Sequence, residues 1–177
     1  GGGGRVDLGI LRRVEQTWTS DNTDALSRIF IQYGYTFAYT PRAMVNWVTD
    51  VPNFDGRSTP LKFRFLVAMM GTLGIGSNLN KFSDEDTALA AKMIAFYKRI
   101  RGTVQLGDLH RLLSPYEGEV TASEYVSADR SQAVVFALLR SQFYSRPVPP
   151  LRLEGLDDKT TYAVENEGGK PLGTFSG

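Results

Sequence analysis

Polar and apolar residues follow one another in two different rhythms along the first half of the chain. Residues 16–19 form a short strand-like run that leads into two acids, Asp21 and Asp24. Residues 22–24 suit the start of a helix, and Gly34 suits its end. The residues at i, i+3, i+4 and i+7 of this helix form one apolar face, namely Leu26, Ile29, Phe30 and Tyr33. The pattern predicts a strand, a short polar turn and a helix.

The next segment predicts a second strand and a loop. Residues 35–39 alternate aromatic and small side chains and are closed by Pro41, which is typical of a strand. Residues 44–50 follow as a polar and aromatic segment, which we interpret as a loop after that strand. This interpretation places Trp47 in the loop.

Two helices and one more strand complete this half of the chain. Thr59 and Pro60 are a typical N-cap and first-turn pair for a helix that is apolar on nearly all sides. Residues 71–76 predict a short glycine-rich strand, because they match neither a phosphate loop nor a dinucleotide fingerprint. Residues 83–86 resemble a capping box at the start of the longest helix, which we expect to end near Gly102.

The order of these elements predicts the fold class. Strands and helices alternate with short connections up to about Asp108, which indicates half of a parallel α/β fold. Beyond Asp108 the helical period disappears, and a boundary falls near residues 109–115. Short strand-like runs separated by turn residues then indicate a sheet or sandwich domain, and they cover residues 122–126, 132–139, 150–156 and 160–165.

Composition excludes several classes of function. The chain has 177 residues, a net charge of +1 and scattered basic residues, so it has no basic stripe for nucleic acid. It has no cysteine, which excludes disulfides and thiolate chemistry and is compatible with a cytoplasmic enzyme. No apolar run reaches the ~18 residues of a membrane span. No signal peptide and no initiator methionine begin the chain, so we expect a fragment.

Asp21 is the first candidate for catalysis. It follows a predicted strand directly, and in parallel α/β folds the loops after the strand carboxyl ends carry the chemistry. Asp24 is the runner-up, and its alternative role is that of a first-turn acid that complements the helix dipole. No cluster of His, Cys and Asp has metal-ligand spacing, so we expect no metal and no cofactor. We interpret the single histidine, His110, as structural.

Several motifs, in order and at close spacing, resemble the C-terminal part of the α-galactosidases (melibiases) of glycoside hydrolase family 36. They are residues 1–7 (GGGGRVD), 16–25 (QTWTSDNTDA), 51–53 (VPN), 57–61 (RSTPL), 67–71 (VAMMG), 107–115 (GDLHRLLSP), 125–127 (YVS), 133–136 (AVVF) and 151–156 (LRLEGL). The resemblance implies the second half of a (β/α)8 TIM barrel over residues 1–108. It also implies an incomplete C-terminal antiparallel β-sandwich over residues 109–177.

The resemblance also implies what each site residue does. Asp21 would be the acid/base, and the backbones of Gly1 and Gly2 would contact galactose, although a flexible linker or cloning scar explains a glycine run equally well. Arg5 would brace that loop or pair with an acid such as Asp24. Trp18 and Trp47 would be apolar walls of the substrate site, although a packed strand aromatic is the other interpretation of Trp18. Residues 44–48 read MVNWV where many relatives have MGAHV, a departure that bears on substrate choice.

The implied activity is hydrolysis of terminal α-D-galactosyl residues from melibiose- or raffinose-type oligosaccharides. Retention by double displacement needs two carboxyl groups about 5–5.5 Å apart. The family's nucleophile lies in a Lys-Trp/Tyr-Asp motif on an earlier barrel strand, and this chain lacks the motif. The same site could accept N-acetylgalactosamine or transfer galactosyl groups. The resemblance also suggests a homo-oligomer at full length. The alternative is an inactive fragment or a galactose-binding remnant.

We expect the isolated chain to be catalytically inactive and poorly stable. An open half barrel leaves strand edges and apolar helix faces uncovered, and one of the two required carboxylates is absent. Urea unfolding and an α-galactosidase assay of the 177-residue chain test this expectation. A soluble chain that unfolds cooperatively would contradict it.

Overall fold

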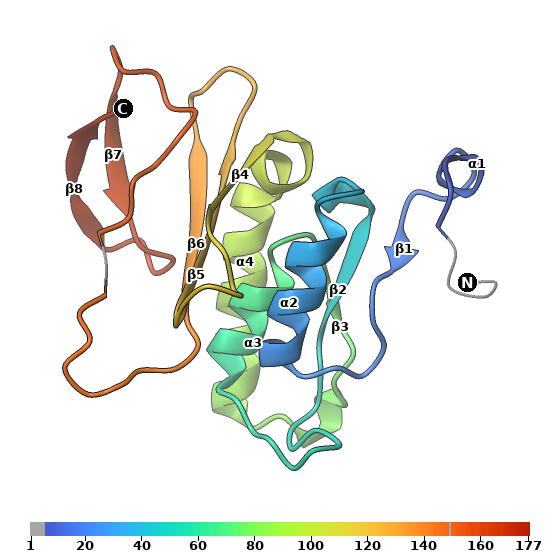
Figure 1. The fold of residues 1–177 in the computed structure, drawn as a ribbon. Coiled ribbons are helices and arrows are strands. Elements are labelled where there is room, and N and C mark those ends of the chain that lie inside the picture. The colour runs from blue at the N-terminus through green and yellow to red at the C-terminus, as the bar shows by residue number, and fades with distance from the viewer. Residues whose placement is uncertain (1–5, 149) are drawn as a thin grey trace. The chain divides into compact units, whose positions relative to one another are not determined.

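The computed structural model describes residues 6–148 and 150–177. Contacts divide the chain into two compact units, Gly1–Lys92 and Met93–Gly177, and each is described by itself. The predicted boundary between residues 108 and 109 stays a prediction. Figure 1 shows all the elements in chain order.

The first unit is built on three parallel strands whose spatial order is their chain order. These strands are β1 (Thr17–Trp18), β2 (Met44–Val48) and β3 (Thr72–Ile75). Its helices are α1 (Leu8–Leu11), α2 (Ala25–Tyr35), α3 (Leu61–Ala68) and the start of α4 (Asp84–Leu106), with the short 3-10 turns η2 (Pro41–Ala43) and η3 (Leu79–Lys81). A helix connects each strand to the next, which confirms the predicted parallel strand–helix alternation.

Helices α2 and α3 cover one face of β2. Alternate residues of this strand, Met44, Asn46 and Val48, are fully buried, while Val45 and Trp47 on the opposite face are half-buried. Ile29 of α2 and Phe65 of α3 are buried in the same unit, and the two helices contact each other and β2 (Figure 1). Val45 and Trp47 therefore point to the face of the sheet opposite these helices.

The strand predicted over residues 35–39 is wrong. Helix α2 continues through Tyr35 and ends in a turn, with Thr36 rather than Gly34 as its C-cap. The ring centroids of Tyr35 and Tyr39 lie 4.8 Å apart, so this part of the alternating pattern is an i, i+4 aromatic contact across a helix end. The second strand lies further along the chain, at Met44–Val48.

The buried face of α2 also differs from the predicted one. Only Ile29 belongs to both the predicted apolar face and the fully buried face. The other buried residues are Ala25, Arg28 and Gln32. The amide of Gln32 donates to the carbonyl of Val67 at 2.8 Å, and the arginine hydrogen-bonds loop carbonyls. A pattern that counts only apolar residues cannot detect polar side chains that are buried by hydrogen bonding.

The start of helix α3 and the end of helix α4 differ from the prediction, and the start of α4 confirms it. Helix α3 begins at Leu61 after Pro60, without a side-chain cap from Thr59. Helix α4 begins with the expected capping box, since the amide of Asp86 donates to Ser83 Oγ at 3.1 Å and the amide of Ser83 donates to Asp86 Oδ2 at 3.4 Å. It ends at Leu106 rather than near Gly102.

The second unit contains the end of α4 and two antiparallel sheets. The larger sheet has the order β4-β5-β6, and the smaller one pairs β7 with β8 (Figure 1). The strands are β4 (Asp108–Leu113), β5 (Val120–Val126), β6 (Ala133–Leu139), β7 (Thr161–Glu165) and β8 (Pro171–Ser176). Tyr125 and Phe136 pack edge to face in the core, with centroids 5.8 Å apart. The predicted change to strands is confirmed, and the sandwich arrangement stays a prediction.

In the second unit, sequence reasoning missed two strands and predicted one that is not there. Strand β4 lies where the domain boundary was expected, and β8 is exposed along its whole length, so it shows no alternation to detect. The strand predicted over residues 150–156 is wrong, because these residues do not form a strand. This segment is held instead by a hydrogen bond of 2.6 Å from the amide of Glu154 to the buried carboxylate of Glu124.

Candidate active site

The candidate site lies in the loops that follow the carboxyl ends of β1 and β2. Asp21 is exposed in the loop between β1 and α2, three residues after Trp18. Asp24 closes the same loop as the N-cap of α2. The position of Asp21 is therefore the one that parallel α/β folds use for chemistry.

A buried guanidinium holds the Asp21 loop from below. Arg28 of α2 is 1% exposed, and its Nη2 donates to the carbonyl of Asp21 at 2.7 Å. Its Nε donates to the carbonyl of Thr23 at 3.3 Å. Burial lowers the pKa of Arg28 to about 10, against the opposing charges of Asp21 and Asp24. Arg28 stays charged at neutral pH, and both aspartates lie within its electrostatic reach.

Asp24 is tied down by several hydrogen bonds. Its Oδ1 accepts from the amides of Leu26 at 2.9 Å and Ser27 at 3.3 Å, and from Arg57 Nη1 at 2.8 Å. Its side chain is 4% exposed. Burial acts to raise the pKa of Asp24, but the hydrogen bonds from Arg57, Ser27 and Leu26 outweigh it and hold the pKa below its usual value. Asp24 is therefore a carboxylate that resists protonation.

Further hydrogen bonds join the loop after β1 to the loop after β2. Thr49 Oγ1 donates to the carbonyl of Thr23 at 3.3 Å, and Arg64 Nη1 donates to the carbonyl of Thr49 at 2.6 Å. Asn53 Oδ1 accepts from the amide of Arg57 at 2.7 Å, which places Arg57 against Asp24. Sequence reasoning missed Arg28, Arg57 and Arg64. Arg57 lies 33 residues from Asp24 and Arg64 lies 15 residues from Thr49, so no local spacing links these two arginines to their partners. Arg28 is close in sequence to the loop that it contacts, but its partners are backbone carbonyls, which no residue pattern indicates.

Trp18 and Trp47 lie together on the open face of the sheet. Their ring centroids are 4.6 Å apart with an interplanar angle of 43°. Trp47 is a residue of strand β2, so its predicted loop position is wrong. Its partner in the β2–β3 register is Gly74, where a Cβ would lie 2.6 Å from the indole ring. The glycine of β3 is what leaves room for the Trp47 ring.

The three other predicted site residues, Gly1, Gly2 and Arg5, lie outside the described residues. The structure thus brings Trp18 and Trp47 together and places Asp21 and Asp24 on one loop above Arg28. Within residues 6–148 and 150–177, no group of three His, Cys, Asp or Glu side chains is arranged to hold a metal ion. The described helices are also too short or too polar to cross a membrane.

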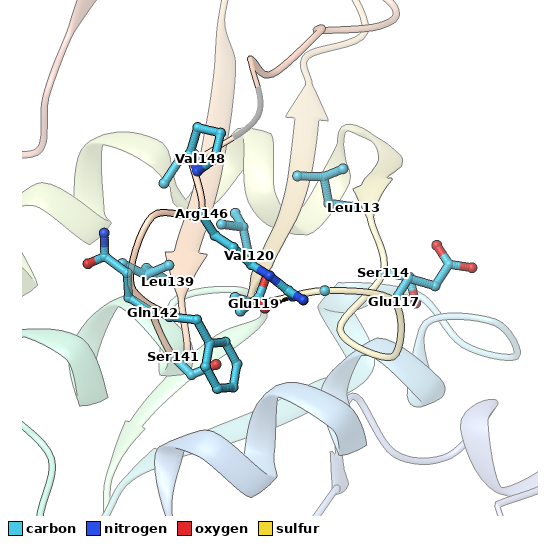
Figure 2. A pocket seen from close by; sticks show the side chains of 13 residues that line it. Leu113, Ser114, Glu117, Glu119, Val120, Leu139, Ser141, Gln142, Arg146 and Val148 are labelled. Atoms are coloured by element: carbon cyan, nitrogen blue, oxygen red, sulfur yellow. Dashed lines mark hydrogen bonds and ion pairs between the residues drawn. The ribbon is translucent and has the colours of Figure 1, made fainter.

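A separate hollow of about 260 Å³ lies in the second unit (Figure 2). It is lined by the turn between β4 and β5 and by residues 141–148, including Phe143. Arg146 Nη1 pairs there with Glu119 Oε1 at 2.7 Å. None of the predicted site residues lines it, and the one arginine of its lining is already paired with Glu119.

The second unit also contains a buried carboxylate. Glu124 of β5 is fully buried and lies opposite His110 of β4 in the strand register. His110 Nδ1 lies 3.4 Å from Glu154 Oε2. Burial raises the pKa of Glu124, although the amide of Glu154 and the charge of His110 act to lower it. The cluster fastens residues 151–156 to the sheet, in agreement with a structural role for His110.

Comparison with known proteins agrees with this geometry. Residues 1–107 match the family model named Melibiase. The chain belongs to the melibiase family. Residues 120–177 match the model of the glycosyl hydrolase family 36 C-terminal domain, so the predicted family is confirmed.

Curated relatives and solved structures agree with the family. The α-galactosidase AgaA of Geobacillus stearothermophilus is 45% identical over 100% of the chain, which covers 24% of AgaA. The probable α-galactosidase G of Aspergillus terreus is 41% identical over 94% of the chain and 23% of its own length. A crystal structure of an AgaA variant in complex with 1-deoxygalactonojirimycin has a TM-score of 0.92 at 44% identity, covering 100% of the chain and 24% of the variant.

The chain therefore spans about a quarter of the length of the relatives it matches. Experiments on activity use this melibiase segment together with the upstream part of its own reading frame, to the length of the relatives. We refer to that product as the extended protein.

We expect Asp24→Ala to destabilise the extended protein by about 1–2 kcal/mol, because it removes an N-cap. Asp24→Asn should cost less, since the amide oxygen can still accept from the helix amides. Thermal unfolding measures both. Asp7 caps the exposed four-residue helix α1 with the same chemistry, so Asp7→Ala is the matched control. If Asp24→Ala destabilises the protein no more than Asp7→Ala does, the buried cap contributes no more to stability than an exposed one.

Glu124→Gln should stabilise the extended protein more at pH 8 than at pH 5. Below the unfolded-state pKa of 4.5, the buried carboxyl is neutral and the two proteins behave alike. As the pH rises through the raised folded-state pKa, the wild type must ionise a buried group and loses stability, whereas the amide does not. The difference in Tm between variant and wild type, measured from pH 4.5 upward, should therefore increase. A constant difference would contradict the assignment.

Proposed function

We propose that this chain is the acid/base-bearing segment of a retaining α-galactosidase that removes terminal α-D-galactosyl residues from small oligosaccharides. The observation that carries the proposal is the position of Asp21, an exposed carboxyl at the carboxyl end of a parallel strand in a segment that matches the melibiase model. The Trp18–Trp47 pair beside the same loop supports it, because indole rings are suited to contact with the apolar face of a sugar.

The two aspartates of the loop have different environments that support different roles. Asp24 accepts a hydrogen bond from Arg57, and its lowered pKa makes it a poor proton donor. Asp21 is exposed, and Arg28 contacts its backbone carbonyl rather than fixing its carboxylate. We therefore assign the acid/base role to Asp21 and the capping role to Asp24.

In the proposed reaction, Asp21 acts twice. A carboxylate from the upstream part of the protein attacks the anomeric carbon while Asp21 donates its proton to the departing glycosidic oxygen. The C–O bond breaks, and a covalent galactosyl-enzyme forms. Asp21, now a carboxylate, then takes a proton from the water that attacks the same carbon. Galactose leaves with its α configuration, and both carboxyl groups return to their starting states.

The proposed pocket combines Trp18 and Trp47 with three residues that lie outside the part of the chain that the structure describes. The backbones of Gly1 and Gly2 contact galactose hydroxyls, with Arg5 as a brace, while Trp18 and Trp47 form the apolar wall. Substrates are raffinose- or melibiose-type α-galactosides. Crystal structures of AgaA variants in complex with raffinose and with stachyose support this substrate class. A homo-oligomeric, cytoplasmic enzyme without a cofactor completes the proposal.

Asp21→Ala in the extended protein tests the acid/base role. On an aryl α-galactoside with a good leaving group, hydrolysis should fall about 100-fold or more, because water attack loses its general base. Azide needs no base, so it should restore turnover and yield the α-galactosyl azide. Asp24→Asn is the comparison variant and should yield no azide product.

Other outcomes would redirect the proposal. Unchanged hydrolysis by Asp21→Ala would move the acid/base role to Asp24 or elsewhere. An unmutated extended protein without activity would favour the inactive or galactose-binding remnant. So would an upstream reading frame without a Lys-Trp/Tyr-Asp motif, because the nucleophile would then be missing.

A further inference from the structure

Arg28 is among the largest fully buried side chains of the described chain. Transferring a guanidinium out of water is costly unless its donors find partners. Its partners here are backbone carbonyls of the one loop that contains Asp21, at 2.7 Å for Asp21 and 3.3 Å for Thr23. A third carbonyl, that of Ser20, lies 3.4 Å from Nη2. One side chain thus contacts the backbone carbonyls of the residue before the proposed acid/base, of the acid/base itself and of the residue two positions after it.

The shortest of these bonds is made with the carbonyl of Asp21 itself. A charged donor at 2.7 Å from a carbonyl is at the strong end of the hydrogen-bond range. Fixing this peptide oxygen and that of Thr23 limits rotation of the backbone on the carboxyl side of the Asp21 Cα. The direction in which the carboxyl leaves the backbone is then set from the buried side of the loop, while its oxygens stay available to substrate.

The planar fork of arginine suits this task. Nε and Nη2 donate from rigidly linked positions, so two carbonyls are held at a fixed separation. A lysine could supply the charge from a single ammonium, but not the fork. The charges of Asp21 and Asp24 both favour the charged form of Arg28, which keeps the donors in place.

We propose that Arg28 is a positioning residue for the acid/base. By fixing the backbone of the β1–α2 loop, it orients the carboxyl of Asp21 toward the glycosidic oxygen. The inference rests on the proposed function of Asp21. Arg28 touches neither substrate nor reacting atoms, and it acts through the carbonyls of Ser20, Asp21 and Thr23.

Arg64 of α3 offers a matched control. It is 8% exposed and also donates to loop carbonyls, at 2.6 Å to Thr49 and at 3.2 Å to Thr59. These carbonyls belong to the loop after β2, which does not contain Asp21. Removing Arg64 therefore removes a comparable buried guanidinium without touching the acid/base loop directly.

The test uses two substrates that differ in their need for an acid. Melibiose expels a sugar alkoxide, which requires protonation, whereas a dinitrophenyl α-galactoside expels a phenolate that does not. A displaced acid lowers kcat/KM for melibiose alone, while a smaller fraction of folded enzyme lowers both values equally. The ratio of the two kcat/KM values thus reports acid placement and is independent of how much protein is folded.

In the extended protein, Arg28→Met should lower the melibiose-to-dinitrophenyl ratio by about tenfold or more, because a misplacement of about 1 Å can cost about 100-fold. Arg28→Lys should lie between the wild type and Arg28→Met. Asp21→Ala should lower the ratio further, and Arg64→Met should leave it near the wild-type value. If Arg28→Met yields no folded protein, the ratio for Arg28→Lys decides.

An unchanged ratio in the Arg28 variants, with a lowered ratio in Asp21→Ala, would overturn the positioning role and leave the proposed function intact. An unchanged ratio in Asp21→Ala would overturn the proposed function itself. A ratio lowered equally by Arg64→Met and Arg28→Met would also overturn the inference, since buried arginines in general would then affect the site.

Discussion

The guanidinium of Arg28, buried beneath the loop between β1 and α2, is the contact on which the candidate site depends. Without it, three backbone carbonyls of the loop, those of Ser20, Asp21 and Thr23, would lose a shared charged donor. Buried carbonyls need partners, and a loop has no strand ladder to supply them. Helix α2 supplies the donor near its N-terminus, so hydrogen bonds tie the helix to the loop that precedes it.

A second buried arginine donates to loop carbonyls after the next strand of the sheet. Arg64 of α3 donates to carbonyls of the loop after β2, and Thr49 of that loop donates to the carbonyl of Thr23. Arg57 adds an ion pair with the cap of α2, in which Arg57 stays partly exposed while the Asp24 carboxylate is buried. The carboxyl ends of the parallel strands are thus connected through polar bonds, while the apolar residues of α2, α3 and β2 form the core behind them.

Two aspartates on one loop illustrate how environment separates roles. Asp24 combines burial with hydrogen bonds that favour its ionised form, whereas the carboxyl of Asp21 is left exposed to solvent. The Trp18–Trp47 pair lies on one side of the sheet, where Gly74 makes room for the Trp47 ring, and this is the side that the proposed pocket assigns to the sugar. In the second unit, a buried carboxylate serves a different purpose, because Glu124 anchors residues 151–156 by accepting a backbone hydrogen bond.

The sequence by itself determined the strand–helix alternation, the later change to antiparallel strands, the capping box of α4 and the family. These features rest on local periodicity, turn chemistry and ordered motifs, which are all written in short stretches of chain. It also singled out Asp21, because a residue directly after a strand is recognisable locally. Only the tertiary structure decided which face of α2 is buried, that Trp47 belongs to a strand, and which arginines serve the two aspartates. Arg57 reaches Asp24 across 33 residues, and Arg28 is buried because carbonyls of a folded loop converge on it. The long-range partner of Arg57 leaves no periodic signal. The partners of Arg28 are close in sequence, but the geometry of these hydrogen bonds exists only once the loop has folded.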